Sequence, residues 1–199
     1  MTSILAIGYT AESSILRIQL FERKNRMKTG LIGLGAMGMP MALNLHRCGY
    51  LHTFWNRSPQ KRESLTEKTG IQAANDIKSV ATQCELVILS VSADEDVLEV
   101  VDQLAESMQQ DNIVIDTSTV SVATAQEAAT RLSKNDIHFL DAPVSGGVEG
   151  AIKGSLSMMV GGDKSILEHI WTVLECLSSR IVHMGPVGNG QATKAVNQI

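Results

Sequence analysis

An apolar run that breaks into a glycine-rich turn and then enters a helix-forming segment is the strongest constraint on the fold of this chain. Gly33, Gly35 and Gly38 have the G-x-G-x-x-G spacing directly after an expected strand. The first glycine permits a tight turn, the second lets the backbone approach a phosphate, and the third lets the helix pack closely on the strand. The helix N-terminus then presents N–H groups and the positive end of its dipole to an anion. The turn is therefore predicted to bind the pyrophosphate of a dinucleotide through Gly33, Leu34, Gly35, Ala36, Met37 and Gly38.

From residue 28 onward, short apolar runs alternate with longer segments of helical periodicity. This order is typical of βαβ units, and runs rich in Val, Ile and Leu are typical of strands buried on both faces of a sheet. The sequence predicts an α/β fold, a Rossmann-type doubly wound and mostly parallel sheet with the glycine-rich turn at its carboxyl edge. The expected strands are residues 28–33, 51–56, 86–91, 113–116, 137–140, 156–160 and 180–183. The expected helices are residues 37–47, 59–69, 75–82, 94–109, 121–133 and 164–177.

The sequence pattern divides the chain into three parts. Residues 1–27 precede the first expected strand and are interpreted as an N-terminal extension that is disordered or lies before the native start. Residues 28–190 are expected to form the dinucleotide-binding Rossmann domain, and residues 191–199 form a short final segment. Residues 1–26 lack a secretory pattern, so a cytoplasmic location is the default, while their basic side chains leave organellar targeting open.

Composition and residue spacing argue against several classes of function. The formal net charge of −4 provides no basic surface for nucleic acid. No apolar segment approaches the ~18 residues that indicate a membrane span. The five histidines and three cysteines have no metal-ligand spacing, so no metal site is expected. The expected ligands are therefore small molecules, with no nucleic acid and no membrane among the partners.

The end of the second expected strand bears on the choice of cofactor. In NAD-binding domains, an Asp or Glu about 20 residues after the glycines accepts hydrogen bonds from the ribose 2′-hydroxyl. This chain has Asn56, Arg57 and Ser58 there, and a guanidinium beside a hydroxyl can hold a 2′-phosphate with no carboxylate to repel it. The pattern favours NADP(H). NAD(H) stays open as the alternative, because a solvated surface arginine also explains Arg57.

Two further glycine-rich segments are expected at the carboxyl edge of the sheet. In residues 141–151, Gly146 and Gly147 leave backbone N–H groups bare beside the Ser145 hydroxyl. Such a loop can hold a substrate carboxylate as an anion nest, and an ordinary structural turn explains it equally well. Residues 185–198 turn into a helix on which Lys194 and Asn197, three residues apart, share a face. There an ammonium and an amide can converge on one substrate oxygen, although a lone helix lysine is more commonly a solvated charge.

Taken together, these segments resemble the β-hydroxyacid dehydrogenase family, which includes 3-hydroxyisobutyrate dehydrogenase, tartronate semialdehyde reductase and the glyoxylate and succinic semialdehyde reductases. The resemblance includes residues 33–45, 116–119, 141–147, 154–162 and 194–198. It implies that Lys194 is the catalytic acid/base and that an amide three or four positions later, here Asn197, assists it. It also implies a substrate-binding set of Ser145, Gly146, Gly147 and Thr119, with further cofactor contacts from Val91 and Thr119.

The resemblance implies an NADP(H)-preferring oxidoreductase of the 3-hydroxyacid dehydrogenase type. Its reaction transfers a hydride between nicotinamide and a small semialdehyde, keto acid or hydroxy acid that bears a carboxylate. Family members continue into a helical domain, so the resemblance implies that residues 191–199 are the start of an interdomain helix whose helical domain is missing. A catalytically incomplete NAD(P)-binding module is therefore the alternative, and a homo-oligomer is compatible with either. A sugar-phosphate substrate, as in related phosphogluconate dehydrogenases, is disfavoured because residues 141–147 contain no cluster of basic side chains.

Overall fold

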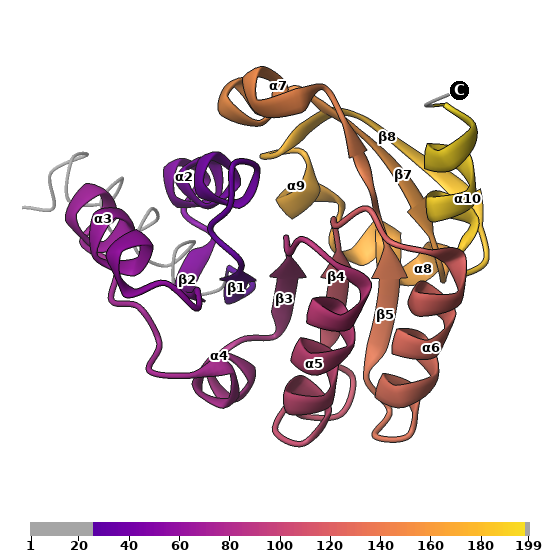
Figure 1. The fold of residues 1–199 in the computed structure, drawn as a ribbon, viewed down its shortest axis with the longest axis horizontal. Helices are drawn as coiled ribbons and strands as arrows, with labels where there is room; N and C mark the ends of the chain where they lie inside the picture. Colours follow the sequence, from indigo (N-terminus) through magenta and orange to yellow (C-terminus); the bar gives the residue numbers. More distant parts are fainter. Residues whose placement is uncertain (1–25, 198–199) are drawn as a thin grey trace, which may run out of the picture.

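The computed structural model describes residues 26–197, and the sequence predictions for residues 1–25 and 198–199 lie outside them. Within this range, eight strands form one mixed sheet with helices on both faces (Figure 1), and no helix has the length and hydropathy to cross a membrane. The strands are β1 (Thr29–Ile32), β2 (Leu51–Trp55), β3 (Leu86–Leu89), β4 (Ile113–Asp116), β5 (His138–Asp141), β6 (Val144–Ser145), β7 (Leu156–Gly161) and β8 (Ser178–Gly185). The helices are α2 (Gly38–Cys48), α3 (Pro59–Thr69), α4 (Ile77–Gln83), α5 (Asp94–Ala105), α6 (Val122–Ser133), α7 (Gly147–Lys153), α8 (Lys164–His169), α9 (Trp171–Leu174) and α10 (Asn189–Val196).

The first five strands form the parallel half of the sheet in the order β2-β1-β3-β4-β5. Every residue of β1, β3 and β4 is buried, which explains why these strands are apolar runs without polar alternation. Strand β1 has β2 on one side and β3 on the other, so the chain changes direction across the sheet at β1. Doubly wound sheets bind ligands at the carboxyl ends of the strands beside such a point. The predicted fold class is confirmed.

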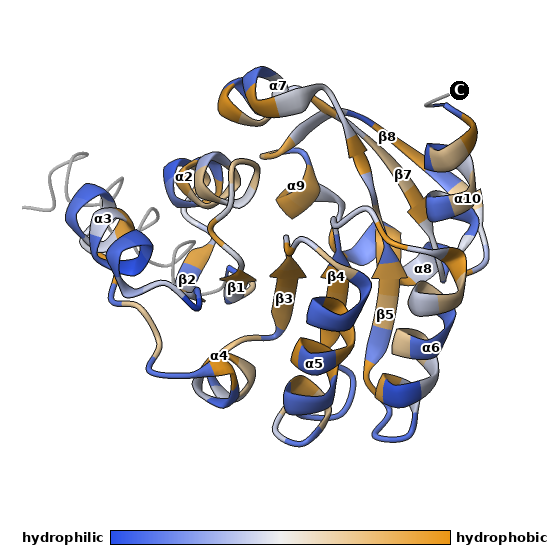
Figure 2. Ribbon diagram, in the orientation of Figure 1, coloured by the Kyte–Doolittle hydropathy of each residue, from blue (hydrophilic) through white to orange (hydrophobic). Residues whose placement is uncertain are grey.

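Buried side chains form two apolar clusters, one on each face of this sheet. Leu31 and Ile88 belong to the cluster beneath α2, whereas the adjacent Ile32 and Val87 belong to the cluster beneath α4, α5 and α6. Successive strand residues therefore pack on opposite helical layers. Figure 2 shows the central strands as strongly apolar and the outer sides of α5 and α6 as hydrophilic.

Beyond β5 the structure differs from the sequence prediction. Strand β7 runs antiparallel to β5 and to the short β6, and β8 is parallel to β7. Strand β6 and helix α7 occupy residues expected to be a loop, because two extended residues and seven helical ones leave no readable periodicity. The single helix expected over residues 164–177 is wrong, since non-helical backbone at Ile170 separates α8 from α9. The chain turns at this buried residue so that both Leu167 and Leu174 reach the core.

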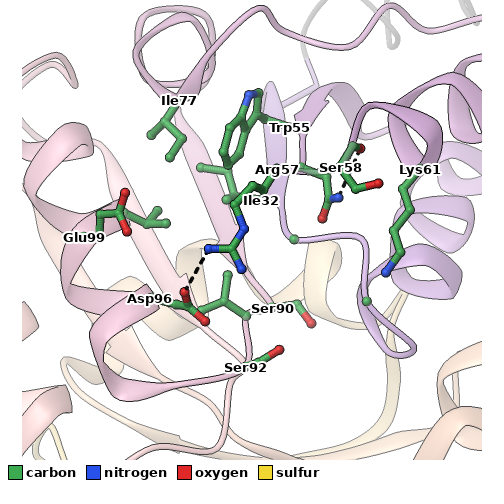
Figure 3. A pocket seen from close by; sticks show the side chains of 15 residues that line it. Ile32, Trp55, Arg57, Ser58, Lys61, Ile77, Ser90, Ser92, Asp96 and Glu99 are labelled. Carbon is green, nitrogen blue, oxygen red and sulfur yellow. Dashed lines mark hydrogen bonds and ion pairs between the residues drawn. The ribbon is translucent and has the colours of Figure 1, made fainter.

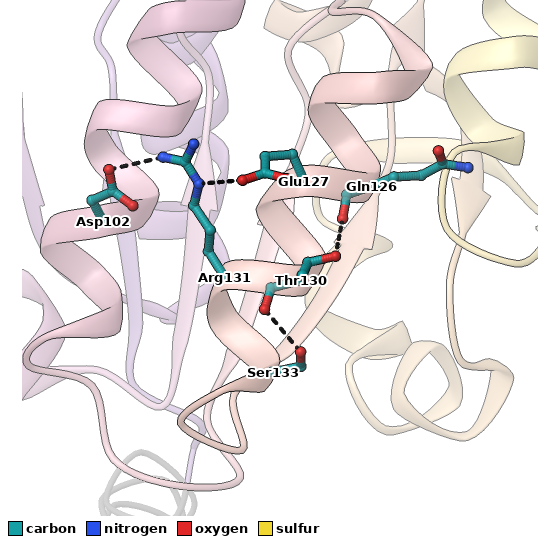
Figure 4. Close-up of polar contacts among 6 residues, drawn as sticks. All are labelled: Asp102, Gln126, Glu127, Thr130, Arg131 and Ser133. Carbon is teal, nitrogen blue, oxygen red and sulfur yellow. Dashed lines mark hydrogen bonds and ion pairs between the residues drawn. The ribbon is translucent and has the colours of Figure 1, made fainter.

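Helices α5 and α6 are joined by polar contacts at both ends. Arg131 of α6 bonds to Asp102 of α5 at 2.9 Å (Figure 4), and this partly exposed pair contributes little to stability. At the other end, Asp94 of α5 accepts hydrogen bonds from Thr124 Oγ1 (2.6 Å) and Ser121 N (3.0 Å). These bonds lower the pKa of the Asp94 carboxyl. They also tie together the loops after β3 and β4, which carry candidate site residues.

Candidate active site

The three glycines of the turn after β1 have different structural roles. A Cβ on Gly33, whose φ is +99°, would lie 2.1 Å from the carbonyl oxygen of Ser90, and a Cβ on Gly38 would lie 1.9 Å from that of Gly33. These two positions are glycine because backbone segments touch there. A Cβ on Gly35 would have no atom within 4 Å. The open side of Gly35 is thus the place where a phosphate can approach the backbone.

A cavity of about 260 Å³ begins at this turn and lies at the carboxyl ends of β1, β2 and β3 (Figure 3). Trp55 lines it at the end of β2, and Val91 lines it just after β3. Its apolar lining also includes Ile77 and Val100, from helices α4 and α5. A slot with one aromatic and several aliphatic walls suits the flat adenine base of a dinucleotide.

Charged side chains line the same cavity from two directions. Arg57 and Lys61 come from the end of β2 and the first turn of α3, whereas Asp96 and Glu99 come from α5. Figure 3 shows Arg57 reaching toward Asp96, and its Nη1 lies 3.7 Å from Asp96 Oδ1. The Arg57 side chain is 84% exposed, so this ion pair is weak and an incoming phosphate can replace it.

Asn56 and Ser58, both expected to bind the cofactor, make contacts within the protein. Asn56 Oδ1 accepts a hydrogen bond of 2.8 Å from the backbone N–H of Leu34, and its Nδ2 donates to Ser58 O. The Leu34 N–H is thereby occupied, so Asn56 supports the glycine-rich turn in the position where NAD-binding domains place a carboxylate. Ser58 is the N-cap residue of α3, but its hydroxyl donates to Gln60 Oε1 at 2.9 Å and does not cap the helix.

Sequence reasoning missed three charged residues of this cavity, namely Lys61, Asp96 and Glu99. Lys61 lies in the first turn of α3, and its place shortly after Arg57 in the sequence was a readable signal. Asp96 and Glu99 come from a helix that follows a different strand, so only the sheet order brings them to Arg57.

Lys194 and Ser145, distant in sequence, meet at the second glycine-rich segment. Lys194 is 7% exposed, and its Nζ donates a 2.9 Å hydrogen bond to Ser145 Oγ. Helix α10 holds the lysine against β7, while β6 presents the serine at the edge of the sheet. The lysine is therefore a buried amine directed at a hydroxyl, in contrast to a solvated surface charge.

Gly146, Gly147 and Asn197 were expected to lie beside Ser145 and Lys194. Gly146 (φ +127°) and Gly147 (φ +61°) follow Ser145 and lead into α7, so their conformations require glycine. Asn197 is the C-cap of α10 and is exposed, whereas Lys194 is buried, and no hydrogen bond joins the two within the described chain. The structure thus brings together Lys194 and Ser145 and leaves the expected assisting amide at the surface.

The loop after β4 connects the cavity to this cluster. Ser118 Oγ accepts a hydrogen bond of 3.0 Å from the N–H of Val91, which lines the cavity. Thr119 is the next residue and is exposed. Gln191 of α10 then contacts this loop, with Nε2 donating to Ser118 O (2.9 Å) and Oε1 accepting from Val120 N (3.2 Å). An unbroken series of hydrogen bonds therefore runs from the cavity to the helix that carries Lys194.

Two buried carboxyl groups lie at the base of this loop. Asp116 and Asp141 end the neighbouring strands β4 and β5 and face each other in register. The pKa of Asp116 is raised to about 6, chiefly by burial, with hydrogen bonds from Ser118 opposing the rise and nearby Asp141 adding to it. Asp116 Oδ2 is a buried side-chain oxygen without a hydrogen-bond partner in the described chain. In that part of the chain, no group of three or more His, Cys, Asp and Glu side chains has the arrangement of a metal site.

The raised pKa makes stability depend on pH through Asp116. Between the unfolded value of 3.8 and about 6, the folded protein holds a proton that the unfolded chain has lost, so stability falls as pH rises through this window. We expect wild type to lose up to roughly 3 kcal/mol relative to Asp116→Asn between pH 4 and pH 7. Denaturant unfolding of both proteins across this range measures the difference. Parallel stability curves would contradict the expectation, and Glu67→Gln, which removes an exposed carboxyl from α3, is the matched control.

The fold and the cavity define a dinucleotide-binding Rossmann domain, with the hydrogen-bonded pair of Lys194 and Ser145 at the same edge of its sheet. A family model described as the NAD binding domain of 6-phosphogluconate dehydrogenase matches residues 28–185. The chain belongs to this family.

Related proteins confirm the family resemblance and show how much of each relative the chain matches. An uncharacterized oxidoreductase of Synechocystis is 39% identical over 180 residues, which are 88% of this chain and 62% of that protein. The structure of Mycobacterium tuberculosis 3-hydroxyisobutyrate dehydrogenase with L-serine has a TM-score of 0.83 and 32% identity, covering 86% of this chain and 59% of that one. The structure of Psf3 in complex with NADP+ and 2-OPP has a TM-score of 0.80 and 28% identity, covering 85% and 61%. The chain thus spans between 59% and 62% of the length of these relatives.

Proposed function

We propose that this protein is an NADP(H)-preferring oxidoreductase that transfers a hydride between nicotinamide and a small semialdehyde, keto acid or hydroxy acid bearing a carboxylate. One observation carries the proposal. Buried Lys194 donates to Ser145 beside the bare backbone of Gly146 and Gly147, at the same sheet edge as the dinucleotide cavity. An amine for proton transfer and an anion-binding loop are the two parts that reduction of a carboxylate-bearing carbonyl compound requires.

The proposed chemistry divides between the cofactor and the protein. Reduced nicotinamide supplies a hydride to the carbonyl carbon when bound. The Lys194 ammonium donates a proton to the carbonyl oxygen as negative charge develops there. In the reverse direction, the uncharged amine accepts the hydroxyl proton. Ser145 Oγ and the N–H groups of Gly146 and Gly147 hold the substrate carboxylate, which orients the carbonyl toward the lysine.

Preference for NADP(H) is proposed from the charges at the end of β2. Arg57 and Lys61 stand on the ribose side of the cavity, and the side chain at the NAD-specific carboxylate position is Asn56. These two cations favour a 2′-phosphate over a 2′-hydroxyl, whereas the carboxylates of Asp96 and Glu99, which reach the cavity from α5, oppose it. Asp96 holds Arg57 only weakly, so the phosphate can take its place at the guanidinium.

We expect Arg57→Ala to weaken NADPH binding by about 10- to 100-fold, the loss of one charge-assisted hydrogen bond, and to change NADH affinity by less than about twofold. Equilibrium titration with both coenzymes measures the two effects. Lys68→Ala removes an exposed cation from the far end of α3 and is the matched control. Equal losses for NADPH and NADH would contradict the assignment of Arg57 to the 2′-phosphate.

A catalytically incomplete NAD(P)-binding module is the second candidate function. The chain matches 59% to 62% of the length of its relatives, which is compatible with this candidate. Tight NADPH binding without reduction of any carboxylate-bearing carbonyl compound, at any protein concentration, would favour this candidate. We also propose a cytoplasmic location and a homo-oligomeric state for the protein.

A further inference from the structure

Gln191 lies between the loop after β4, which contacts the dinucleotide cavity, and the helix that carries Lys194. It lies in the first turn of α10, three residues before Lys194, and is 3% exposed. Its amide donates to Ser118 O at 2.9 Å and accepts from Val120 N at 3.2 Å. These two backbone groups flank Thr119, so one side chain holds the loop on both sides of the residue expected beside the nicotinamide.

The backbone of Gln191 is held equally firmly. Its N–H donates to Asp141 Oδ2 at 2.9 Å, while the N–H of Gly188 donates to Asp141 Oδ1 at 2.7 Å. Asp141 is fully buried, and its carboxylate stands at the N-terminus of α10, where negative charge is favourable. A Cβ on Gly190 would lie 2.7 Å from Asp141 Oδ2, so the close approach of α10 to this carboxylate leaves no room for a side chain at Gly190.

From this arrangement we infer that Gln191 is a positioning residue, which fixes Lys194 relative to the Thr119 loop. The inference rests on the function proposed above for these two residues. Residues three apart lie on one face of a helix, so holding Gln191 also holds the rotation of α10 that points Lys194 at Ser145. The Gln191 amide supplies both a donor for Ser118 O and an acceptor for Val120 N, whereas a carboxylate lacks the donor and an aliphatic chain lacks both.

Chemical reactivity of the lysines tests the inference without requiring turnover. The purified protein is reductively methylated with formaldehyde, and mass spectrometry compares Lys194 with Lys153, an exposed lysine on α7. Gln191→Leu is expected to raise the Lys194 to Lys153 rate ratio about tenfold, the equivalent of one or two lost hydrogen bonds. Gln83→Leu, which replaces an exposed glutamine on α4, is the matched control and should leave the ratio unchanged.

The thiol of Cys84 separates positioning from a general loss of stability. Cys84 is 3% exposed within the other apolar cluster, so its labelling by a thiol reagent reports global opening. The inference requires Lys194 to become reactive while Cys84 stays protected. An unchanged Lys194 ratio, or Lys194 and Cys84 reacting faster in step, overturns it. NADPH affinity and the turnover of Lys194→Ala test the proposed function separately, since neither depends on the labelling result.

A second variant and a measurement on wild type keep the inference testable if Gln191→Leu does not fold. Gln191→Glu keeps the side-chain length and the acceptor for Val120 N, and should raise the Lys194 ratio by a smaller factor in the same direction. In wild-type protein, amide hydrogen exchange should give the N–H groups of Val120 and Gln191 the same protection, because they open together. Independent opening of the loop and of α10 contradicts the inference.

Discussion

Replacing Lys194 with alanine is expected to lower turnover with a small carboxylate-bearing aldehyde by about 10²- to 10⁴-fold, the usual contribution of a general acid or base. The physical reason is that Lys194 is a buried amine whose Nζ lies 2.9 Å from Ser145 Oγ, in the proposed anion-binding loop. NADPH affinity should change by less than about twofold, since the dinucleotide cavity at the ends of β1, β2 and β3 is lined by residues of other elements. Absorbance of the reduced nicotinamide measures turnover, and equilibrium titration measures affinity.

Two control variants sharpen this experiment. Lys153→Ala removes an exposed lysine from α7 and should keep wild-type turnover. Lys194→Arg keeps the positive charge, but a guanidinium does not give up its proton in proteins, so turnover should stay low. Wild-type turnover in Lys194→Ala would exclude the lysine as the acid/base, whatever the affinity for NADPH.

The second large effect is expected from two glycines of the turn after β1, substituted one at a time. Gly38→Ala places a methyl group 1.9 Å from the carbonyl oxygen of Gly33 and should destabilise the fold by about 3 kcal/mol or more, lowering Tm by about 10 °C. Gly35→Ala meets no atom within 4 Å and should leave Tm unchanged. It should nevertheless weaken NADPH binding about tenfold or more, because the methyl group lies where the pyrophosphate must approach the backbone.

Thermal unfolding and NADPH titration of the same two variants separate the structural glycine from the binding glycine. Gly70→Ala is a further comparison, because its positive φ (+72°) strains an alanine at the end of α3 while lying outside the cavity. Its affinity for NADPH should equal that of wild type. Wild-type affinity in Gly35→Ala would mean that the pyrophosphate does not cross this turn.

Local sequence patterns predicted the parallel half of the fold well for a physical reason. The strand, turn and helix around Gly33, Gly35 and Gly38 are specified by residues within one short segment, and fully buried strands leave continuous apolar runs. The break at Ile170 has no comparable signal, because a buried isoleucine continues the helical periodicity of residues 164–177 even where the backbone turns. Strand β6 and helix α7 are too short for any period to be read.

The sequence predicted those candidate site residues whose roles are indicated by the residues next to them. Lys194 and Ser145 could each be named from their glycine-rich surroundings, and the fold supplies the contact between them. The roles of Asp96 and Gln191 depend on elements that are distant in sequence, so no local spacing indicates them. Asn56 was expected to bind the cofactor; it lines the cavity, and its amide also supports Leu34 of the adjacent turn, a contact that no local pattern indicates.

The most direct test of the proposed NADP(H)-dependent reduction is a coenzyme titration followed by the addition of a substrate. The purified chain is titrated with NADPH and with NADH while Trp55 fluorescence is recorded, using Trp171→Phe so that Trp55 is the sole reporter. Glyoxylate or succinic semialdehyde is then added while absorbance of the reduced nicotinamide is followed. The account predicts tighter binding of NADPH than of NADH, and then oxidation of NADPH that depends on Lys194. Equal or absent binding of the two coenzymes, or NADPH binding with no oxidation on adding either substrate, would contradict it.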